Sequence, residues 1–159
     1  MLMIKYCPNQ SRTRAHSALK DTHPAEALHY SIDLPLGLIG FPALRKLKVS
    51  SHPEEAPFLH LQDSEKGEIE FIALEPYGIF KDYKVEILDP DLEYLDIQSP
   101  EDVHILNIVS IPNEAEARDI TVNLVGPIII NRRTNLGKQI VIGNYKDYSS
   151  THILFDYKN

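Results

Sequence analysis

Histidine is the first residue type to consider here, because imidazole both binds metal ions and transfers protons near neutral pH. No two histidines of this chain are four residues apart, and the single cysteine, Cys7, completes no Cys-His ligand set with them. The spacing therefore predicts no metal site. The seven histidines are His16, His23, His29, His52, His60, His104 and His152.

A group of acids mimics the start of a calcium-binding loop. Asp89, Asp91 and Glu93 have the required spacing. The sixth position of such a loop should be glycine and the twelfth glutamate, but Tyr94 and Pro100 occupy them. The acids fit better at the positive end of a helix.

Residues 136–139 (Leu-Gly-Lys-Gln) could be taken for part of a phosphate-binding loop. The remainder of the G-x-x-x-x-G-K-[ST] pattern is missing, and the segment leads into an apolar run typical of a strand. We predict a turn here, and no cofactor for the protein.

Nucleophilic catalysis has no good candidate, because the chain lacks a G-x-S-x-G motif and Cys7 lies in a polar terminal segment. Glu68 and Glu70 alternate onto one face of a predicted strand, where acid-base chemistry remains open. A solvated strand face explains them better. We therefore expect a protein that presents a surface and is not an enzyme.

Length and composition favour one folded domain. The chain has 159 residues, 43% hydrophobic residues and a net charge of -7. An acidic body argues against nucleic-acid binding and would attract a basic partner. The sequence shows no secretory signal and no apolar stretch near the ~20 residues of a membrane span. We expect a cytoplasmic protein without a membrane partner.

Residues 1–27 are polar, lack periodicity and are predicted to be a flexible extension. The domain is expected over residues 28–159. Apolar and polar residues alternate from Leu28 to Leu34, which predicts a half-buried strand. Similar patterns predict strands at 58–62, 69–74, 84–88, 103–111, 120–124, 128–130, 140–142 and 152–155, with a short element over 44–49.

Short helical segments are predicted between some of these strands. Asp89 followed by Pro90 is typical of a helix start, with Asp89 as N-cap and an end near Ile97. Ser99, with Asp102 three residues later, is a second signal for the start of a helix. Residues 79–83 predict a further helical turn. The mostly short connections favour antiparallel neighbours. We expect a mostly β, single-domain, closed or nearly closed β-barrel-like sheet.

The most distinctive stretch runs from Asn123 to Gln139, Asn-Leu-Val-Gly-Pro-Ile-Ile-Ile-Asn-Arg-Arg-Thr-Asn-Leu-Gly-Lys-Gln. It predicts a largely buried β-hairpin around an Asn- and Gly-bearing turn. Its amides, Asn123 and Asn131, are more typical of side chains that satisfy backbone groups at a bend than of ligand contacts.

This stretch resembles the C-terminal signature of the flagellar assembly factor FliW family. Other segments match the family in the same order: the loop at 37–41, the strands around 58–71, the turn at 76–83 and the motif at 99–103. The resemblance covers residues 28–155. Its signature positions, expected to be structural, are Asn123, Pro127, Asn131, Gly137 and Gln139.

The resemblance implies a non-enzymatic protein with two protein partners. Members of the family bind flagellin and the RNA-binding translational repressor CsrA, so that flagellin synthesis is coupled to assembly. A basic RNA-binding partner is consistent with the acidic balance of this chain. Arg132 and Arg133 depart from this balance, because they place two cations in the hairpin turn.

Two apolar segments outside regular strands are candidates for partner contact, although both could instead cap the ends of the sheet. An alternative function is a small-ligand-binding or enzymatic β-barrel, and an oligonucleotide-binding barrel is a third, which the acidic charge disfavours. The candidate contact residues are Leu38, Phe41, Pro76, Tyr77, Phe80 and Tyr83.

Overall fold

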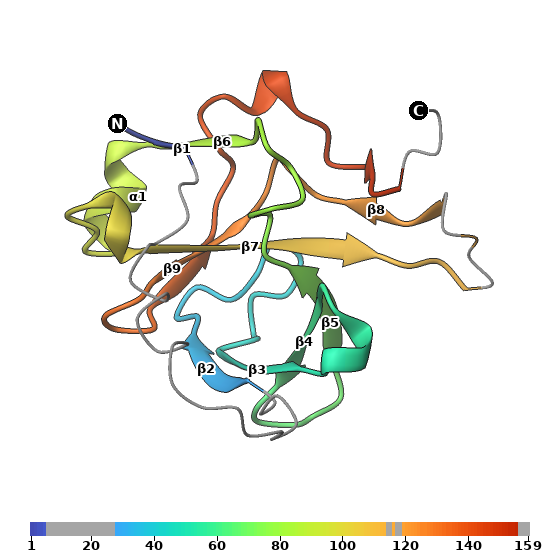
Figure 1. The fold of residues 1–159 in the computed structure, drawn as a ribbon. Helices are drawn as coiled ribbons and strands as arrows, with labels where there is room; N and C mark the ends of the chain where they lie inside the picture. The colour runs from blue at the N-terminus through green and yellow to red at the C-terminus, as the bar shows by residue number, and fades with distance from the viewer. Residues whose placement is uncertain (6–27, 114–115, 117–118, 156–159) are drawn as a thin grey trace, which may run out of the picture.

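Antiparallel β-strands dominate the computed structural model, which describes residues 1–5, 28–113, 116 and 119–155 (Figure 1). This confirms the prediction of a mostly β domain with a few helical turns. The strands are β1 (Leu2–Lys5), β2 (His29–Asp33), β3 (Lys46–Ser51), β4 (Phe58–Asp63), β5 (Glu70–Leu74), β6 (Lys84–Ile87), β7 (Val103–Ser110), β8 (Thr121–Val122), β9 (Ile128–Asn131), β10 (Gly137–Gln139) and β11 (His152–Ile153).

The main sheet is open, so the expected barrel closure is not found. Its strands follow the order β10-β9-β7-β5-β4-β3-β2, and β8 pairs with both β7 and β11. A single parallel bridge between Asp33 and Leu136 brings the two edge strands together without a continuous ladder. Short edge strands and this one bridge limit the exposed edge.

Strand β7 organises the sheet because it pairs with three others and runs through the centre of the molecule (Figure 1). Its first half pairs with β9 and its second half with β5 and β8. The five residues from Val103 to Asn107 are all buried, which explains why the sequence reads as an apolar run without alternation. Apolar side chains on its two faces enter two different core clusters.

The N-terminal prediction needs correction at its start. Leu2–Lys5 is not part of an extension but forms β1, which pairs antiparallel with β6. Ile4 is buried in the core beside Val85 and Ile87. Residues 6–27 lie outside the described part of the chain.

The helical segments differ in detail from the prediction. Helix α1 (Asp89–Tyr94) begins one residue earlier than expected, so Leu88 rather than Asp89 is its N-cap. The 3-10 helix η3 (Pro100–Asp102) has the predicted capping box between Ser99 and Asp102. Residues 79–83 form turns without a helix. Further 3-10 helices are η2 (Pro53–Glu55) and η5 (Tyr145–Asp147).

The hairpin after β9 also differs from the prediction. Strand β10 covers Gly137–Gln139, and the apolar run from Ile140 to Ile142 follows it. The run still lies against the segment that precedes β9, because the N–H groups of Ile140 and Ile142 donate to the carbonyls of Pro127 and Val125. Within the described residues, no helix has the length and apolar character needed to cross a bilayer.

Candidate partner-binding surfaces

The loop between β2 and β3 combines a buried base with exposed apolar side chains. Leu34, Leu38 and Leu44 are buried and fix the loop to one core cluster. Leu36, Ile39 and Phe41 are 55%, 62% and 40% exposed, so three large apolar side chains of one loop reach the surface. The loop therefore presents apolar surface from a fixed base.

A tight turn sets the direction of these side chains. Leu38 and Phe41 exchange backbone hydrogen bonds, with N–O distances of 3.1 and 2.8 Å. Gly37 has a φ of 69°, and a Cβ atom there would lie 2.5 Å from the carbonyl oxygen of Phe41. Only glycine fits both the angle and the space. The ring of Phe41 then packs edge-on against Phe71 at 5.1 Å between centroids.

Of the two candidates in this loop, Phe41 is 40% exposed and Leu38 is 4% exposed. Leu38 is therefore a core residue, whereas Phe41 is accessible to a partner. The sequence indicates the whole loop from Leu36 to Phe41, but Leu36 and Ile39, which are more exposed, are not among the predicted contact residues. Their signal was present: large apolar residues separated by glycines in a loop that cannot bury all of them.

The turn at residues 76–83 places its candidates in different environments. Tyr77 is exposed, Phe80 is half-buried, and Pro76 and Tyr83 are buried. The Tyr83 hydroxyl donates to the carbonyl oxygen of Leu124 at 2.6 Å, and the amide of Asn107 donates to that hydroxyl. Burial raises the pKa of Tyr83. Of these four candidates, Tyr77 is the one that is exposed, at 44%.

An open groove of about 530 Å³ lies beside this turn. Its walls are partly aromatic, and its charges are balanced between two lysines and two aspartates. No cysteine lines it. The lining residues are Phe80, Lys81, Asp82, Tyr83, Leu124, Lys146, Asp147, Tyr148, Ser149 and His152.

The signature residues at 123–139 bind the framework together. Asn123 accepts hydrogen bonds from the N–H groups of Val125 and Gly126 at 3.0 and 2.8 Å, which closes the bend before β9. Gln139 donates to the carbonyl of Gly126 and accepts from the N–H of Ile39. The signature strand thus holds the exposed apolar loop through one side chain.

Two further signature positions, Pro127 and Gly137, are constrained by their surroundings. Pro127 is buried at the start of β9, and its carbonyl accepts the N–H of Ile140. A Cβ atom on Gly137 would lie 2.6 Å from Ile32 and 3.2 Å from Leu34. Any larger residue would therefore push β10 away from β2.

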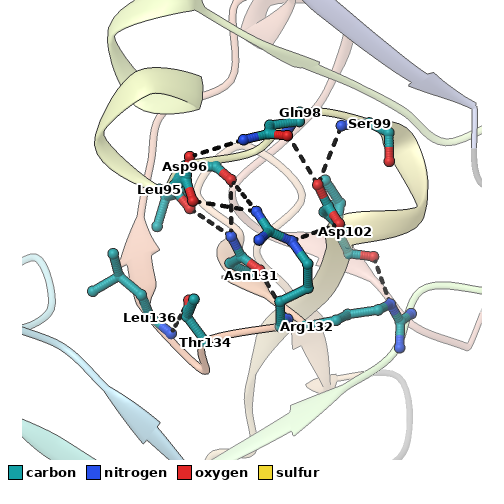
Figure 2. A network of polar contacts seen from close by, with 11 residues as sticks. Leu95, Asp96, Gln98, Ser99, Asp102, Asn131, Arg132, Thr134 and Leu136 are labelled. Atoms are coloured by element: carbon teal, nitrogen blue, oxygen red, sulfur yellow. Dashed lines mark hydrogen bonds and ion pairs between the residues drawn. The ribbon is translucent and has the colours of Figure 1, made fainter.

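Asn131 lies at the centre of a polar network that joins the hairpin to α1 and η3 (Figure 2). Its buried amide donates to the carbonyls of Leu95 and Asp96 at 2.8 and 3.0 Å. Its oxygen accepts the N–H of Arg133. The side chain satisfies three backbone groups at once, and its removal would leave the carbonyl of buried Leu95 without this donor.

The same network neutralises acids. Arg133 contacts the carboxylates of Asp96 and Asp102 at 3.2 and 3.0 Å. Asp102 also accepts N–H groups from Gln98 and Ser99, and these bonds, followed by Arg133, lower its pKa. The two arginines of the turn therefore do not form a free basic tip, since Arg132 donates to the carbonyl of Val103.

Two stretches of the chain contain six acids each, and they differ in their partners. We call residues 89–102 the paired acidic segment and residues 54–70 the open acidic segment. In the first, Asp91 contacts Lys138 at 2.6 Å, Asp89 contacts the N-terminal amine, and Arg133 holds two more acids. In the second, no acid forms an ion pair with lysine or arginine among the described residues. Its acids are Glu54, Glu55, Asp63, Glu65, Glu68 and Glu70.

Comparison with known proteins identifies the family of this chain. The family model described as "FliW protein" matches residues 15–154. The chain belongs to the FliW family. A crystal structure of the flagellar assembly factor FliW superposes with a TM-score of 0.70 at 30% identity, covering 81% of this chain and 88% of that one.

Curated members of the FliW family are similar over most of their length. The protein named flagellar assembly factor FliW from Natranaerobius thermophilus is 38% identical over 125 residues, which is 79% of this chain and 82% of that protein. The protein of the same name from Clostridium novyi is 38% identical over 124 residues, 78% of this chain and 85% of that protein. These matches confirm the family resemblance read from the sequence. The family model begins 13 residues before the expected domain start at residue 28.

Proposed function

We propose that this protein is a non-enzymatic flagellar assembly factor that binds flagellin and antagonises the translational repressor CsrA in the cytoplasm. The match of the FliW family model to residues 15–154 carries this proposal. Binding of both partners would couple flagellin translation to flagellar assembly. The protein would act by protein contacts, without binding nucleic acid or a membrane.

The exposed apolar loop is the proposed contact for flagellin. Leu36, Ile39 and Phe41 provide accessible apolar surface, and the buried leucines of the same loop keep it in place. A fixed loop loses little conformational freedom on binding, which favours affinity. Tyr77 is proposed as a second contact, with half-buried Phe80 behind it.

The open acidic segment is the proposed contact for CsrA. A repressor that binds RNA must carry basic surface, and unpaired carboxylates attract such a surface over a Debye length. Glu54, Glu65 and Glu68 are exposed and have no lysine or arginine partner among the described residues. This segment therefore keeps its negative field.

Binding assays with purified flagellin and CsrA test the proposal. We expect the protein to bind each partner, and we expect Ile39→Ala to weaken flagellin binding about tenfold, as for a contact residue at an interface. The matched control is Ile111→Ala, which truncates an exposed isoleucine elsewhere. Binding to neither partner would contradict the proposed function. Equal loss for both variants would contradict only the assignment of the loop.

A small-ligand function is the alternative, and the groove near Phe80 is the observation that favours it, since its volume is in the range of ligand sites. Native mass spectrometry of the purified protein distinguishes the two. A co-purified small molecule that is lost in Phe80→Ala would support the alternative. The polypeptide mass alone, together with binding of flagellin, would support the assembly factor.

A further inference from the structure

A histidine and carboxylate cluster lies on the open acidic segment, apart from the apolar loop. His52 directly precedes η2, Glu55 ends η2, and His60 lies on β4. One potential ligand atom from each of the three lies within 4.8 Å of the others. The rings of His52 and His60 are 5.3 Å apart, at an angle of 72°.

Both nitrogens of the His60 ring face a carboxylate. Nε2 lies 2.5 Å from Glu55, and Nδ1 lies 2.6 Å from Glu70 on the neighbouring strand β5. A histidine that binds a metal through one nitrogen commonly donates its other N–H to a carboxylate, which fixes the ring and its tautomer. Glu70 is placed for that supporting role, and Nε2 is directed toward the remaining two residues.

We propose that His52, Glu55 and His60 bind a divalent cation of the zinc class, with Glu70 orienting the ring of His60. Two imidazoles and a carboxylate are ligands that Zn²⁺ accepts, with a water molecule as the fourth. Ca²⁺ and Mg²⁺ prefer oxygen ligands and are disfavoured by the two nitrogens.

The geometry requires a small rearrangement, in which Glu55 moves slightly away from Nε2 of His60, now 2.5 Å distant, to make room for the cation. Ligand atoms of tetrahedral zinc lie about 3.4 Å apart, for bonds of about 2.1 Å. His52 and Glu55 are exposed, so their side chains can rotate toward His60, which is held on the sheet. The bound cation would link η2 to β4 and neutralise part of the open acidic segment.

The test is isothermal titration of ZnCl₂ into the full-length, tag-free protein after treatment with EDTA. Cys7, His16 and His23 could also bind zinc, so the measurements use the variant C7S/H16A/H23A beside the natural sequence. We expect one zinc ion per chain in both proteins. In the variant background, His52→Ala should weaken binding at least tenfold, and His60→Ala should abolish it.

Two further variants separate the supporting residue from unrelated histidines. Glu70→Gln should weaken zinc binding ten- to a hundredfold, as for a carboxylate that orients a metal-binding histidine. His29→Ala and His152→Ala, both exposed elsewhere, should leave binding unchanged. Circular dichroism establishes that each variant is folded. His52 is exposed, so its replacement keeps the test informative even if His60→Ala unfolds.

The outcomes are decisive in both directions. Absorption of Co²⁺ in the visible region, typical of tetrahedral coordination, should appear in the C7S/H16A/H23A variant and vanish with His52→Ala. If C7S/H16A/H23A loses all zinc binding, or if His52→Ala and His60→Ala bind zinc normally, the proposed site is wrong.

Discussion

The two acidic segments have the same number of acids but differ in what surrounds them. Residues 89–102 contain no lysine or arginine, whereas residues 54–70 include Lys66, so the first appears more negative in the sequence. The structure reverses this order. Lys138, Arg133 and the N-terminal amine contact four of the six acids in the paired acidic segment.

The reversal follows from the topology of the sheet. Strand β9 pairs with the start of β7, and β10 pairs with β9, which brings the cations of the hairpin to α1 and η3. Strand β4 pairs with β3, but Lys46 of β3 contacts Asp33 on β2. Among the described residues, Glu55 and Glu70 contact His60 instead of a lysine or arginine. The charge available to a partner therefore depends on pairing in space, not on local sequence composition.

Breaking the network at Asn131 should have the largest effect on the paired acidic segment. Asn131→Ala removes the amide that donates to the carbonyls of Leu95 and Asp96 and leaves that of Asp96 with Arg133 as donor, at a cost of about 3 kcal/mol in the free energy of unfolding. Urea unfolding followed by circular dichroism measures it. Asn144→Ala, which removes a less buried amide, should cost about 1 kcal/mol. Equal losses in the free energy of unfolding for the two variants would show that the network around Asn131 stabilises the protein no more than an ordinary side-chain hydrogen bond does.

Removing Arg133 should have a smaller effect that shrinks in acid. Because the pKa of Asp102 is lowered on folding, its contribution to stability is present above the ordinary value of 3.8 and is lost as the pH falls through the folded value. Urea midpoints of Arg133→Ala should be below those of the natural protein at pH 6, and the gap should narrow toward pH 2, where the hydrogen bond to the Asp96 carbonyl remains. Arg45→Ala, at another exposed arginine, is the control. A gap of the same size at both pH values would contradict the ion pairs as its main cause.

His60 should give the smallest effect, with the opposite pH dependence. Hydrogen bonds to Glu70 and Glu55 raise its pKa above 6.5, so its contribution is full below 6.5 and is lost as the pH rises through the folded value. With EDTA present, the advantage of the natural protein over His60→Gln should therefore decline from pH 6 to pH 8. NMR titration should give a pKa above 6.5 for His60, lowered by Glu70→Gln. An unchanged value in Glu70→Gln would show that this contact does not raise it.

Local patterns in the sequence were sufficient for most strands. Alternation from Leu28 to Leu34 predicted β2, because one face is buried and the other is in water. The apolar run at 103–111 predicted β7 for the opposite reason, since both faces are buried. Capping signals located η3 but placed the start of α1 one residue late, because the chain turns at Leu88.

Features that depend on distant contacts could not be predicted in this way. The pairing of β1 with β6 joins residues 79 to 85 positions apart, and the polar stretch that follows the short apolar run at residues 1–4 concealed it. Barrel closure depends on the register at the edges, where only the bridge between Asp33 and Leu136 forms. His52 and His60 have no helical spacing, and they meet because η2 turns back onto β4. The sequence marked the apolar loop around Ile39 but not which of its side chains stay exposed, since burial in a loop is decided by its anchor residues.

Association kinetics of CsrA with two matched charge-reversal variants test the central claim most directly. Glu54→Lys/Glu68→Lys changes the open acidic segment. Glu93→Lys/Glu101→Lys changes by the same charge the two exposed acids of the paired acidic segment that lie outside its ion pairs, in a segment whose other four acids are neutralised. At low salt we predict that the first variant lowers the association rate constant at least about tenfold, and that the second lowers it about threefold or less. Equal effects of the two variants, or no effect of the first, would contradict the account.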